Sequence, residues 1–280
     1  MARSELKIRG GLTPRWVGVP RWGRQHLGYS PSGAQDQTSF YQVNQLLGQQ
    51  DSTCLELILP PHQIEFFGNG WVAMVGANHR LELDGVEVNA KEVLQVKEGS
   101  KLKIQVQGLG ARLYLQMAGG VRKESDAITF DSNLDRPKKV ELGRPSWWPE
   151  PGVIRFLRGP EWNCLEMIDA GSVWRVGANS NAQGLRLEGP VSGEAMKCRD
   201  EIEMLSGPVF DGTVQLAPAG PIALLRDRQC IGGYPRVMQV IACDVDLLAQ
   251  VLPGQLLQFM EVGLPEAREL ESKRRQFLSR

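Results

Sequence analysis

Short runs of alternating polar and apolar residues recur along almost the whole chain, separated by glycine, proline and asparagine. In KLKIQVQ, residues 101–107, apolar and polar side chains alternate, which is typical of a strand with one face in solvent. In LELDGVEV, residues 81–88, Asp84-Gly85 supplies the positive φ angles that a tight hairpin turn requires. Many short strands joined by such turns predict an all-β protein with a sandwich or barrel architecture.

Three segments have helical patterning instead. Residues 36–47 carry apolar side chains on one face and end before Gly48. Residues 244–252 predict a short helix capped by Asp244. The tail from Pro265 has acidic residues first and basic residues last, an order that suits the helix dipole. A few short helices are therefore expected among the strands.

Strand patterning weakens between residues 121 and 152, where the chain is charged, polar and contains several prolines. We expect an exposed loop and an inter-domain connector in this segment. The connector divides the chain into two predicted domains of ordinary size, residues 1–150 and 151–280.

The charge balance disfavours several classes of partner. Lys+Arg and Asp+Glu total 32 each, without a long block of either sign, which argues against nucleic-acid and polybasic membrane surfaces. No apolar stretch approaches the ~18 residues of a membrane span. The opening MARSELKIRG lacks the apolar core of a signal peptide. The sequence predicts a soluble, cytoplasmic protein.

Cysteine, histidine and short catalytic motifs give no metal or nucleophile signature. The five cysteines are far apart and contain no C-x-x-C pair, so we expect reduced thiols. His26, His62 and His79 have no metal-ligand spacing, and we expect surface or loop positions for them and no metal site. Phosphate-loop, nucleophile-elbow and zinc-hydrolase motifs are absent. The G-x-G of residues 108–113 predicts a turn between two strands.

Three polar, glycine-bearing segments remain as candidates for chemistry. In the first, residues 23–37, Gly33 follows Ser32 shortly before the helix that begins at Asp36. Free backbone N–H groups gather at such a helix start and can hold a carboxylate or phosphate. The structural alternative is plain capping of the helix by Ser32 or Asp36.

The second segment is SNAQGLRLEG, residues 180–189. Asn181 and Gly184 suit a tight turn, and Arg186 alternates with leucines on the strand that follows. A fixed guanidinium can hold a carboxylate through two hydrogen bonds. The structural alternative is a solvated strand face.

The third segment is DRQCIGGYP. Asp227 and Gln229 point to the same face of an extended strand. Gly232-Gly233 permits close approach by another chain or a ligand, and Tyr234 adds a ring and a hydroxyl. The structural alternative is a turn that connects two strands.

The order of motifs along the chain resembles the allophanate hydrolase subunit 2 family. The motifs are SGAQD, AGG, RGP, SNAQGLRLEG, DRQ-x-x-GGYP and a closing D-x-x-x-L-A-Q-x-x-P-G. This family includes the C subunit of the bacterial 5-oxoprolinase, the KipI antagonist and part of the urea carboxylase carboxyltransferase domain. The resemblance runs from about Gly11 to Val262, and DRQ-x-x-GGYP is its most specific piece.

The resemblance implies a pair of cyclophilin-like β-barrel subdomains. It also implies a B-subunit-like partner, similar to allophanate hydrolase subunit 1. In the 5-oxoprolinase system an A-subunit-like protein completes an ATP-dependent ring opening of 5-oxo-L-proline to L-glutamate. ATP would therefore act through the complex, and the chain itself carries no ATP-grasp domain and no biotin-attachment motif.

For an enzyme component of this kind, we expect specific roles for individual residues. Asp227 is the candidate catalytic residue, as a proton acceptor. Arg24 and Arg186 are expected to hold a carboxylate or phosphate, and Asn181 and Gln229 an amide. The full substrate-binding set is Arg24, Ser32, Asp36, Asn181, Arg186, Gln229 and Tyr234. A backbone-shaping role is assigned to Gly33, Gly119, Gly120, Gly232, Gly233 and Pro235.

The chain departs from the family pattern at two informative places. Pro20-Arg21 stands where the family usually has Gln-Asp, and SNAQG stands in place of SNRMG. A cation in place of an anion changes which charge a pocket prefers. Two alternatives to a 5-oxoprolinase component stay open. One is a regulatory protein of the KipI-antagonist type, and the other is a biotin-dependent carboxyltransferase that acts on a urea-like substrate.

Overall fold

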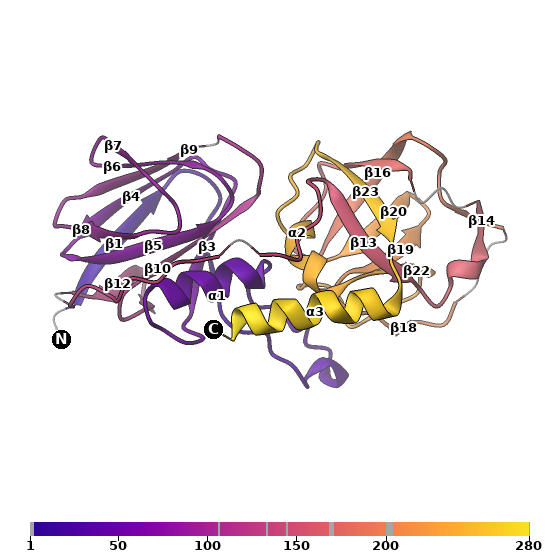
Figure 1. Cartoon of the computed structure of the whole chain (residues 1–280), viewed down its shortest axis with the longest axis horizontal. Helices are drawn as coiled ribbons and strands as arrows, with labels where there is room; N and C mark the ends of the chain where they lie inside the picture. The colour runs from indigo at the N-terminus through magenta and orange to yellow at the C-terminus, as the bar shows by residue number, and fades with distance from the viewer. Residues whose placement is uncertain are drawn as a thin grey trace. The chain divides into compact units, whose positions relative to one another are not determined.

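The protein is represented by a computed structural model, which describes residues 3–105, 107–132, 134–143, 145–167, 171–199 and 204–279. The chain forms two compact units. Unit 1 consists of residues 1–19 and 36–144, and unit 2 of residues 20–35 and 145–280. Strands dominate both units, as Figure 1 shows, and the all-β prediction is confirmed.

Unit 1 is built from two antiparallel sheets. Its strands are β1 (Arg3–Arg9), β2 (Arg15–Val17), β3 (Cys54–Ile58), β4 (His62–Phe67), β5 (Gly70–Gly76), β6 (Arg80–Leu83), β7 (Val86–Val88), β8 (Val93–Val96), β9 (Lys101–Gln105), β10 (Arg112–Met117), β11 (Val121–Glu124) and β12 (Ala127–Asp131). The larger sheet has the order β11-β12-β1-β4-β9-β6-β7, and the smaller has the order β2-β3-β10-β5-β8. Apolar residues of both sheets form one core, to which β9 contributes Leu102 and Ile104 at alternate positions, as predicted.

Two predicted turns of unit 1 are confirmed. Asp84 and Gly85 have φ angles of 52° and 85°, and they join β6 to β7 in the hairpin that the sequence predicts. The G-x-G segment lies between β9 and β10.

Residues 121–131 form a hairpin and not the predicted exposed loop. β11 and β12 pair on either side of Ser125-Asp126. β11 is an edge strand of the larger sheet, and charged side chains are common on edge strands because they discourage pairing with other chains. The polar composition of this segment therefore concealed the strands.

Helix α1 (Gln37–Leu46) packs against β5 and β10 of the smaller sheet. Asp36 caps it, since a carboxylate oxygen accepts the Ser39 N–H at 2.9 Å. The Tyr114 hydroxyl of β10 accepts the Asp36 N–H and donates to Glu56 Oε2, both at 2.7 Å. The helix predicted over residues 36–47 is confirmed.

Unit 2 contains a closed barrel with the strand order β13-β22-β19-β20-β16-β15-β23. The strands of this unit are β13 (Val153–Arg158), β14 (Leu165–Met167), β15 (Val173–Val176), β16 (Gly184–Ser192), β17 (Lys197–Cys198), β18 (Gly207–Pro208), β19 (Thr213–Ala217), β20 (Gly220–Leu224), β21 (Ile231–Gly232), β22 (Arg236–Val240) and β23 (Leu256–Glu261). Among the described strand pairs of the barrel, only β13–β23 is parallel. Phe156, Trp174, Val214 and Phe259 are among the side chains that fill its core.

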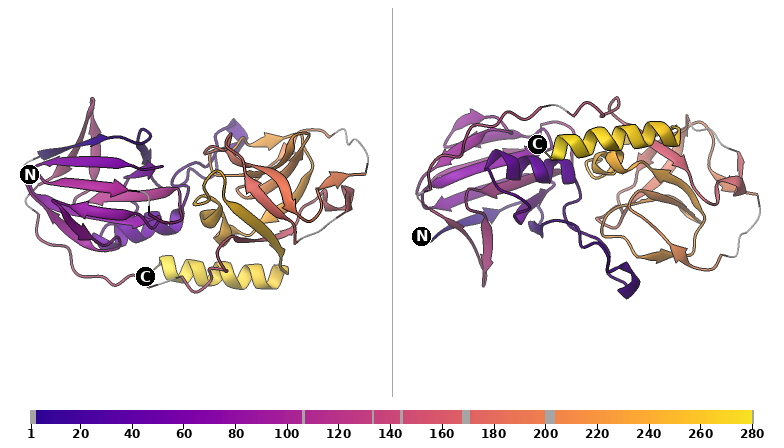
Figure 2. Two further views of the ribbon diagram at one scale, coloured as in Figure 1. Left: turned by 90° about the horizontal axis from the view of Figure 1, so that it is seen from above. Right: turned by 60° about the horizontal axis from the view of Figure 1, so that its bottom comes forward.

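The helices of unit 2 are short, apart from one at the C-terminal end. They are η1 (Gln25–Leu27), η2 (Trp162–Cys164), η3 (Ala242–Asp244), α2 (Val245–Leu248) and α3 (Leu264–Leu278). Helix α3 lies along the outside of the barrel (Figure 2) and packs on Trp147, Ile241 and Val262. The helix predicted from Pro265 is confirmed. None of the described helices is both long and apolar enough to span a membrane.

The short helix predicted over residues 244–252 is confirmed only over Val245–Leu248, and Asp244 is its N-cap residue. Helix α2 has four residues, and Asp244 makes no side-chain capping hydrogen bond. Its fully buried carboxylate instead accepts hydrogen bonds from Arg155, including Arg155 Nη2 at 2.6 Å. The buried guanidinium of Arg155, 89 residues away in the sequence, binds both carboxylate oxygens, and these bonds stand in place of a side-chain cap.

The expectation of five reduced thiols also needs correction. Cys164, the last residue of η2, and Cys198 of β17 form a disulfide, with their Cα atoms 4.9 Å apart. The two residues are 34 positions apart, and sequence spacing alone does not reveal such a pairing. Cys54, Cys230 and Cys243 are free.

His62 begins β4 and His79 lies in the loop between β5 and β6, so the loop alternative holds for His79, but both side chains are buried and not at the surface. His62 Nε2 lies 3.1 Å from the Ile58 carbonyl oxygen, and neither ring nitrogen of His79 has a described hydrogen-bond partner. Burial lowers the pKa of both imidazoles because an apolar environment disfavours the charged form.

The two histidines predict acid-sensitive stability. Their folded-state pKa values lie below the value of ~6.5 in an unfolded chain, so the unfolded state binds more protons as the pH falls. The contribution of the two neutral imidazoles to stability is fully present above about pH 6.5 and is lost as the pH falls towards their folded-state pKa values. The free energy of unfolding of the wild type is expected to fall between pH 7.5 and pH 5.5. In His79→Gln we expect this fall to be smaller by about 1 kcal/mol. Urea denaturation at each pH measures this difference. The control is His26→Gln, because His26 is exposed. If the free energy of unfolding of His79→Gln changes with pH as much as that of the wild type, the prediction is contradicted.

Candidate functional site

Three loops of unit 2 meet at one place, and we call residues 31–35, 180–184 and 225–229 the three-loop cluster. The Ser32 N–H donates to the Arg226 carbonyl oxygen at 3.0 Å, and the Asp227 N–H donates to the Ala182 carbonyl oxygen at 3.2 Å. The Leu225 N–H donates to the Gln183 carbonyl oxygen at 2.8 Å. The three polar segments that the sequence singles out separately therefore converge in the fold.

A hydroxyl–carboxylate pair lies at the centre of this cluster. Ser32 Oγ donates to Asp227 Oδ1 at 2.5 Å, and both side chains are half-buried. Ser32 and Gly33 have φ angles of 53° and 83°, so the backbone makes a left-handed bend that brings the serine back towards Asp227. The hydrogen bond holds the Asp227 carboxylate in one orientation.

Gln35 connects all three loops from a fully buried position. Its side-chain oxygen accepts the Arg226 N–H at 3.1 Å, and its backbone oxygen accepts Arg226 Nε at 3.0 Å. Its Nε2 donates to the Ala182 carbonyl oxygen at 3.3 Å. This glutamine therefore fixes the loops on which Ser32 and Asp227 are mounted.

Beneath the cluster runs a buried series of alternating charges, which we call the arginine–aspartate chain. Asp211 accepts hydrogen bonds from Arg228 Nε at 2.9 Å and from Arg226 Nη1 at 3.1 Å. Asp246 accepts from Arg226 Nη2 at 2.7 Å and from Arg274 Nη2 of α3 at 3.1 Å. The side chains are at most 9% exposed. Since Arg226 and Arg228 flank Asp227, the arginine–aspartate chain holds the backbone on both sides of that carboxylate.

The second predicted segment supplies a turn and an exposed cation. Asn181 Oδ1 accepts the Gln183 N–H at 2.8 Å, which closes the turn, and its NH2 group has no described partner. Arg186 lies on β16 between the buried Leu185 and Leu187, and its side chain is exposed. The structure describes no ion pair for Arg186, so its guanidinium is available to a ligand.

The third segment is anchored by Gln215 of β19. Gln229 Nε2 donates to the Gln215 side-chain oxygen at 3.2 Å, and Gln215 Nε2 donates to the Tyr234 carbonyl oxygen at 3.1 Å. A Cβ atom on Gly232 would lie 2.5 Å from Gln215 Nε2, so a larger residue there would displace the amide that contacts Gln229 and Tyr234. A Cβ atom on Gly233 would meet nothing closer than 3.4 Å, so space does not require a glycine at that position. The Tyr234 side chain is exposed.

An ion pair holds the residues that follow Tyr234-Pro235. Arg236 Nη2 lies 2.6 Å from Glu161 Oε1, and Arg236 N and Nε both donate to Glu161 Oε2 at 2.9 Å. Hydrogen bonding from Arg236 lowers the pKa of Glu161. Glu161 directly follows the RGP motif, so the two motifs support each other.

Some predicted residues lie elsewhere. Asp36 belongs to unit 1, where its carboxylate caps α1, which is the structural alternative considered for the first segment. Arg24 is exposed next to η1, without a described hydrogen bond from its side chain. Gly119 and Gly120 follow β10 in unit 1 with φ angles of 79° and 88°.

The buried residues that hold the three-loop cluster in place were not predicted from the sequence. They are Gln35, Asp211, Arg226, Arg228, Asp246 and Arg274. The available signal was RDR, residues 226–228, between two apolar runs, because charged residues in such a place need buried partners. The partners themselves are distant in sequence and cannot be identified from it.

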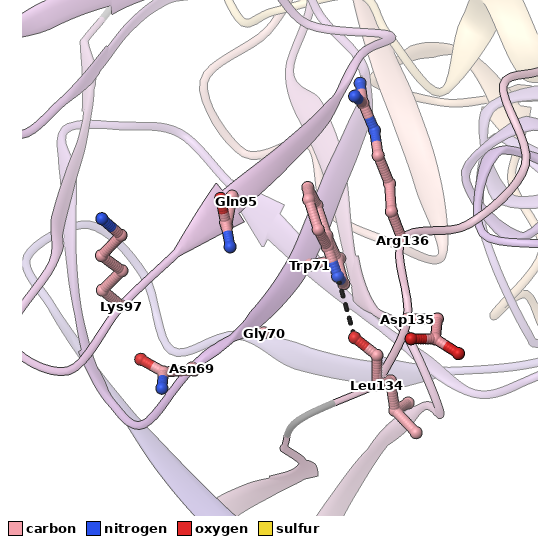
Figure 3. Close-up of a pocket in the computed structure, with 8 residues that line it drawn as sticks. All are labelled: Asn69, Gly70, Trp71, Gln95, Lys97, Leu134, Asp135 and Arg136. Carbon is pink, nitrogen blue, oxygen red and sulfur yellow. Dashed lines mark hydrogen bonds between the residues drawn. The ribbon is translucent and has the colours of Figure 1, made fainter.

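One pocket, with a volume of about 390 Å³, lies in unit 1 at β5, β8 and residues 134–136 (Figure 3). Trp71 Nε1 donates to the Leu134 carbonyl oxygen at 3.0 Å, and the Arg136 guanidinium lies 5.5 Å from the Trp71 ring centre. Lys97, Gln95 and Arg136 are exposed, and none of the predicted site residues lines this pocket. The three-loop cluster is therefore the better candidate site.

The cluster offers acid–base chemistry and donors to an anion or an amide. Asp227 can accept a proton, while Asn181 on its turn and Arg186 on β16 present N–H donors. Among the described residues no group of three His, Cys, Asp or Glu side chains is placed to hold a metal ion.

Comparison with known proteins places the chain in a family. The pattern of the carboxyltransferase domain, subdomain A and B, matches residues 27–128 and 123–261. The chain belongs to this carboxyltransferase-domain family. Both matched regions include parts of the three-loop cluster, since residues 31–35 lie in the first and residues 180–184 and 225–229 in the second.

Relatives within the family include components of one enzyme from two bacteria. The chain is 29% identical to the C subunit of 5-oxoprolinase from Escherichia coli (strain K12), over 93% of this chain and 92% of that protein. It is 28% identical to the 5-oxoprolinase C subunit of Haemophilus influenzae, over 98% of this chain and 95% of that protein. The crystal structure of K. lactis urea amidolyase is similar in fold, with a TM-score of 0.81 and 21% identity. That match covers 98% of this chain but only 20% of the much longer amidolyase.

Proposed function

We propose that the protein is a C-subunit-like component of an ATP-dependent 5-oxoprolinase, acting with a B-subunit-like partner and an A-subunit-like protein. The observation that carries the proposal is the Ser32–Asp227 pair at the junction of three family motifs. Two relatives named as 5-oxoprolinase C subunits, similar over almost their whole length, support it.

In this proposal the cluster binds the lactam. 5-Oxo-L-proline carries a carboxylate and a cyclic amide, and ring opening requires water to add to the amide carbonyl while the ring nitrogen gains a proton. Arg186 would hold the carboxylate, and Asn181 and Gln229 would hydrogen-bond the amide. Asp227, oriented by Ser32, would accept a proton from the attacking water. ATP would be bound by the complex.

Reconstitution tests the proposal. The chain is co-expressed with a B-subunit-like and an A-subunit-like protein, and L-glutamate formed from 5-oxo-L-proline is measured with and without ATP. We expect turnover only when all three proteins and ATP are present. A folded three-protein complex that forms no L-glutamate would contradict the proposed function.

A regulatory protein is the second candidate, and the family departure at Pro20-Arg21 favours it. Arg21 is exposed, in a position where the family usually has a carboxylate. A protein of this type would bind a B-subunit-like partner without turnover in the reconstituted complex. The third candidate, a carboxyltransferase acting on a urea-like substrate, is tested by transfer of a carboxyl group from carboxybiotin to urea.

A further inference from the structure

The segment just before Ser32 forms a closed loop with exposed apolar side chains. The Arg21 N–H donates to the Pro31 carbonyl oxygen at 2.8 Å, which brings the two ends of the loop together. Within it η1 is closed by Gly28, whose N–H donates to the Gln25 carbonyl oxygen at 2.9 Å. We call residues 21–31 the 21–31 loop. Its backbone is ordered by its own hydrogen bonds, as in other compact surface loops.

The large apolar side chains of this loop face solvent. Trp22 is 60% exposed, Leu27 is 63% exposed and Tyr29 is 55% exposed. A single exposed apolar residue is ordinary, but three within eight positions concentrate apolar surface in one short loop. Tryptophan, tyrosine and arginine are also the residues that most often dominate the binding energy of protein interfaces.

The charges of the loop indicate what kind of surface covers it. Residues 20–35 contain Arg21 and Arg24 but no aspartate or glutamate. Neither arginine side chain has a described hydrogen bond or ion pair in the part of the chain that the structure describes. A complementary surface therefore needs an apolar pocket for the rings and carboxylates around it for the two guanidinium groups.

We propose that the 21–31 loop is the docking element for the B-subunit-like partner, through an apolar pocket with an acidic rim on that protein. This inference rests on the proposed function, because that function supplies the partner. The loop ends at Pro31, and the next residue makes the hydrogen bonds to Arg226 and Asp227. A partner that holds the loop therefore also holds Ser32 in the position where it donates to Asp227.

The experiment measures the affinity of the chain for the B-subunit-like protein by isothermal titration calorimetry. Trp22→Ser is expected to weaken binding by about 30-fold, as for an interface residue that dominates the energy. The triple variant Trp22→Ser, Leu27→Ser, Tyr29→Ser is expected to abolish detectable binding. Circular dichroism should be unchanged, because these side chains are in solvent in the free protein.

Matched controls carry the same change at other exposed apolar positions. Val86, the first residue of β7, and Leu109, between β9 and β10, are 66% and 65% exposed in unit 1, and their serine variants should bind like the wild type. A double variant Arg21→Glu, Arg24→Glu should slow association by about tenfold at low salt, with a smaller effect at high salt.

Each outcome decides the inference. It is overturned if the wild type does not bind the B-subunit-like protein, or if the triple variant binds as tightly as the wild type. Loop-dependent binding to anionic phospholipid vesicles, or loop-dependent self-association, without partner binding also overturns it, because the occupant is then different. Loop-dependent partner binding without 5-oxo-L-proline turnover would support the docking element and contradict the proposed function.

Discussion

Asp246→Ala is expected to lower the free energy of unfolding by about 3–5 kcal/mol. Asp246 accepts hydrogen bonds from both Arg226 and Arg274, and its side chain is 2% exposed. Its removal takes one carboxylate away from each guanidinium, although Arg226 keeps its ion pair with Asp211 and Arg274 keeps Glu271. A buried cation that loses a partner retains the cost of leaving water, and this cost dominates the change.

Urea denaturation followed by circular dichroism measures the effect. The matched control is Glu269→Ala, which removes an exposed i,i+4 pair with Lys273 and should leave the midpoint unchanged. The double variant Asp246→Leu, Arg274→Met should recover part of the loss, because it removes one of the two undercompensated charges. A loss in Asp246→Ala no larger than in the surface control would refute a stabilising role for the arginine–aspartate chain.

Asp227→Asn is expected to reduce kcat of the reconstituted complex by at least about 100-fold. Asparagine keeps the shape of the side chain, and its carbonyl oxygen can still accept the Ser32 hydroxyl. The basicity of the carboxylate is lost while the hydrogen bond to Ser32 can remain. A loss of kcat in this variant therefore reports on proton transfer and not on the structure of the three loops.

The comparison with Ser32→Ala makes this test specific. That variant keeps the carboxylate but loses the hydrogen bond that orients it, so we expect a loss of about tenfold, well short of that in Asp227→Asn. Unfolding curves for both variants check that the unit is intact. If Asp227→Asn retains most of the wild-type kcat in a folded complex, Asp227 is not the proton acceptor.

The strands and the convergence of motifs were accessible to sequence reasoning for physical reasons. Strand alternation in residues 101–107 and the Asp84-Gly85 turn depend on local backbone geometry, which is determined by residues close together in the sequence. The family resemblance grouped Ser32, Asn181 and Asp227, and the structure brings the loops that carry them together. Their roles in catalysis and binding stay predictions.

What sequence reasoning missed depends on contacts between distant residues. The Asp244 carboxylate binds Arg155, which lies 89 positions earlier, so a residue with the local features of a helix cap has another partner. Cys164 at the end of η2 pairs with Cys198 of β17, 34 positions away, and no local pattern identifies this pairing. The hairpin at residues 121–131 was missed because edge strands are polar.

The placement of residues 20–35 in unit 2 has a consequence for how the protein can be divided. A fragment that begins at residue 145 would contain every strand of the barrel, yet it would lack Ser32 and the buried Gln35. Arg226 would then lose two of its hydrogen-bond acceptors, both supplied by Gln35. The two halves are therefore not modules that evolution or an engineer could exchange with a single cut. Transplanting the barrel with its candidate site would require a second, short piece of chain from near the N-terminus.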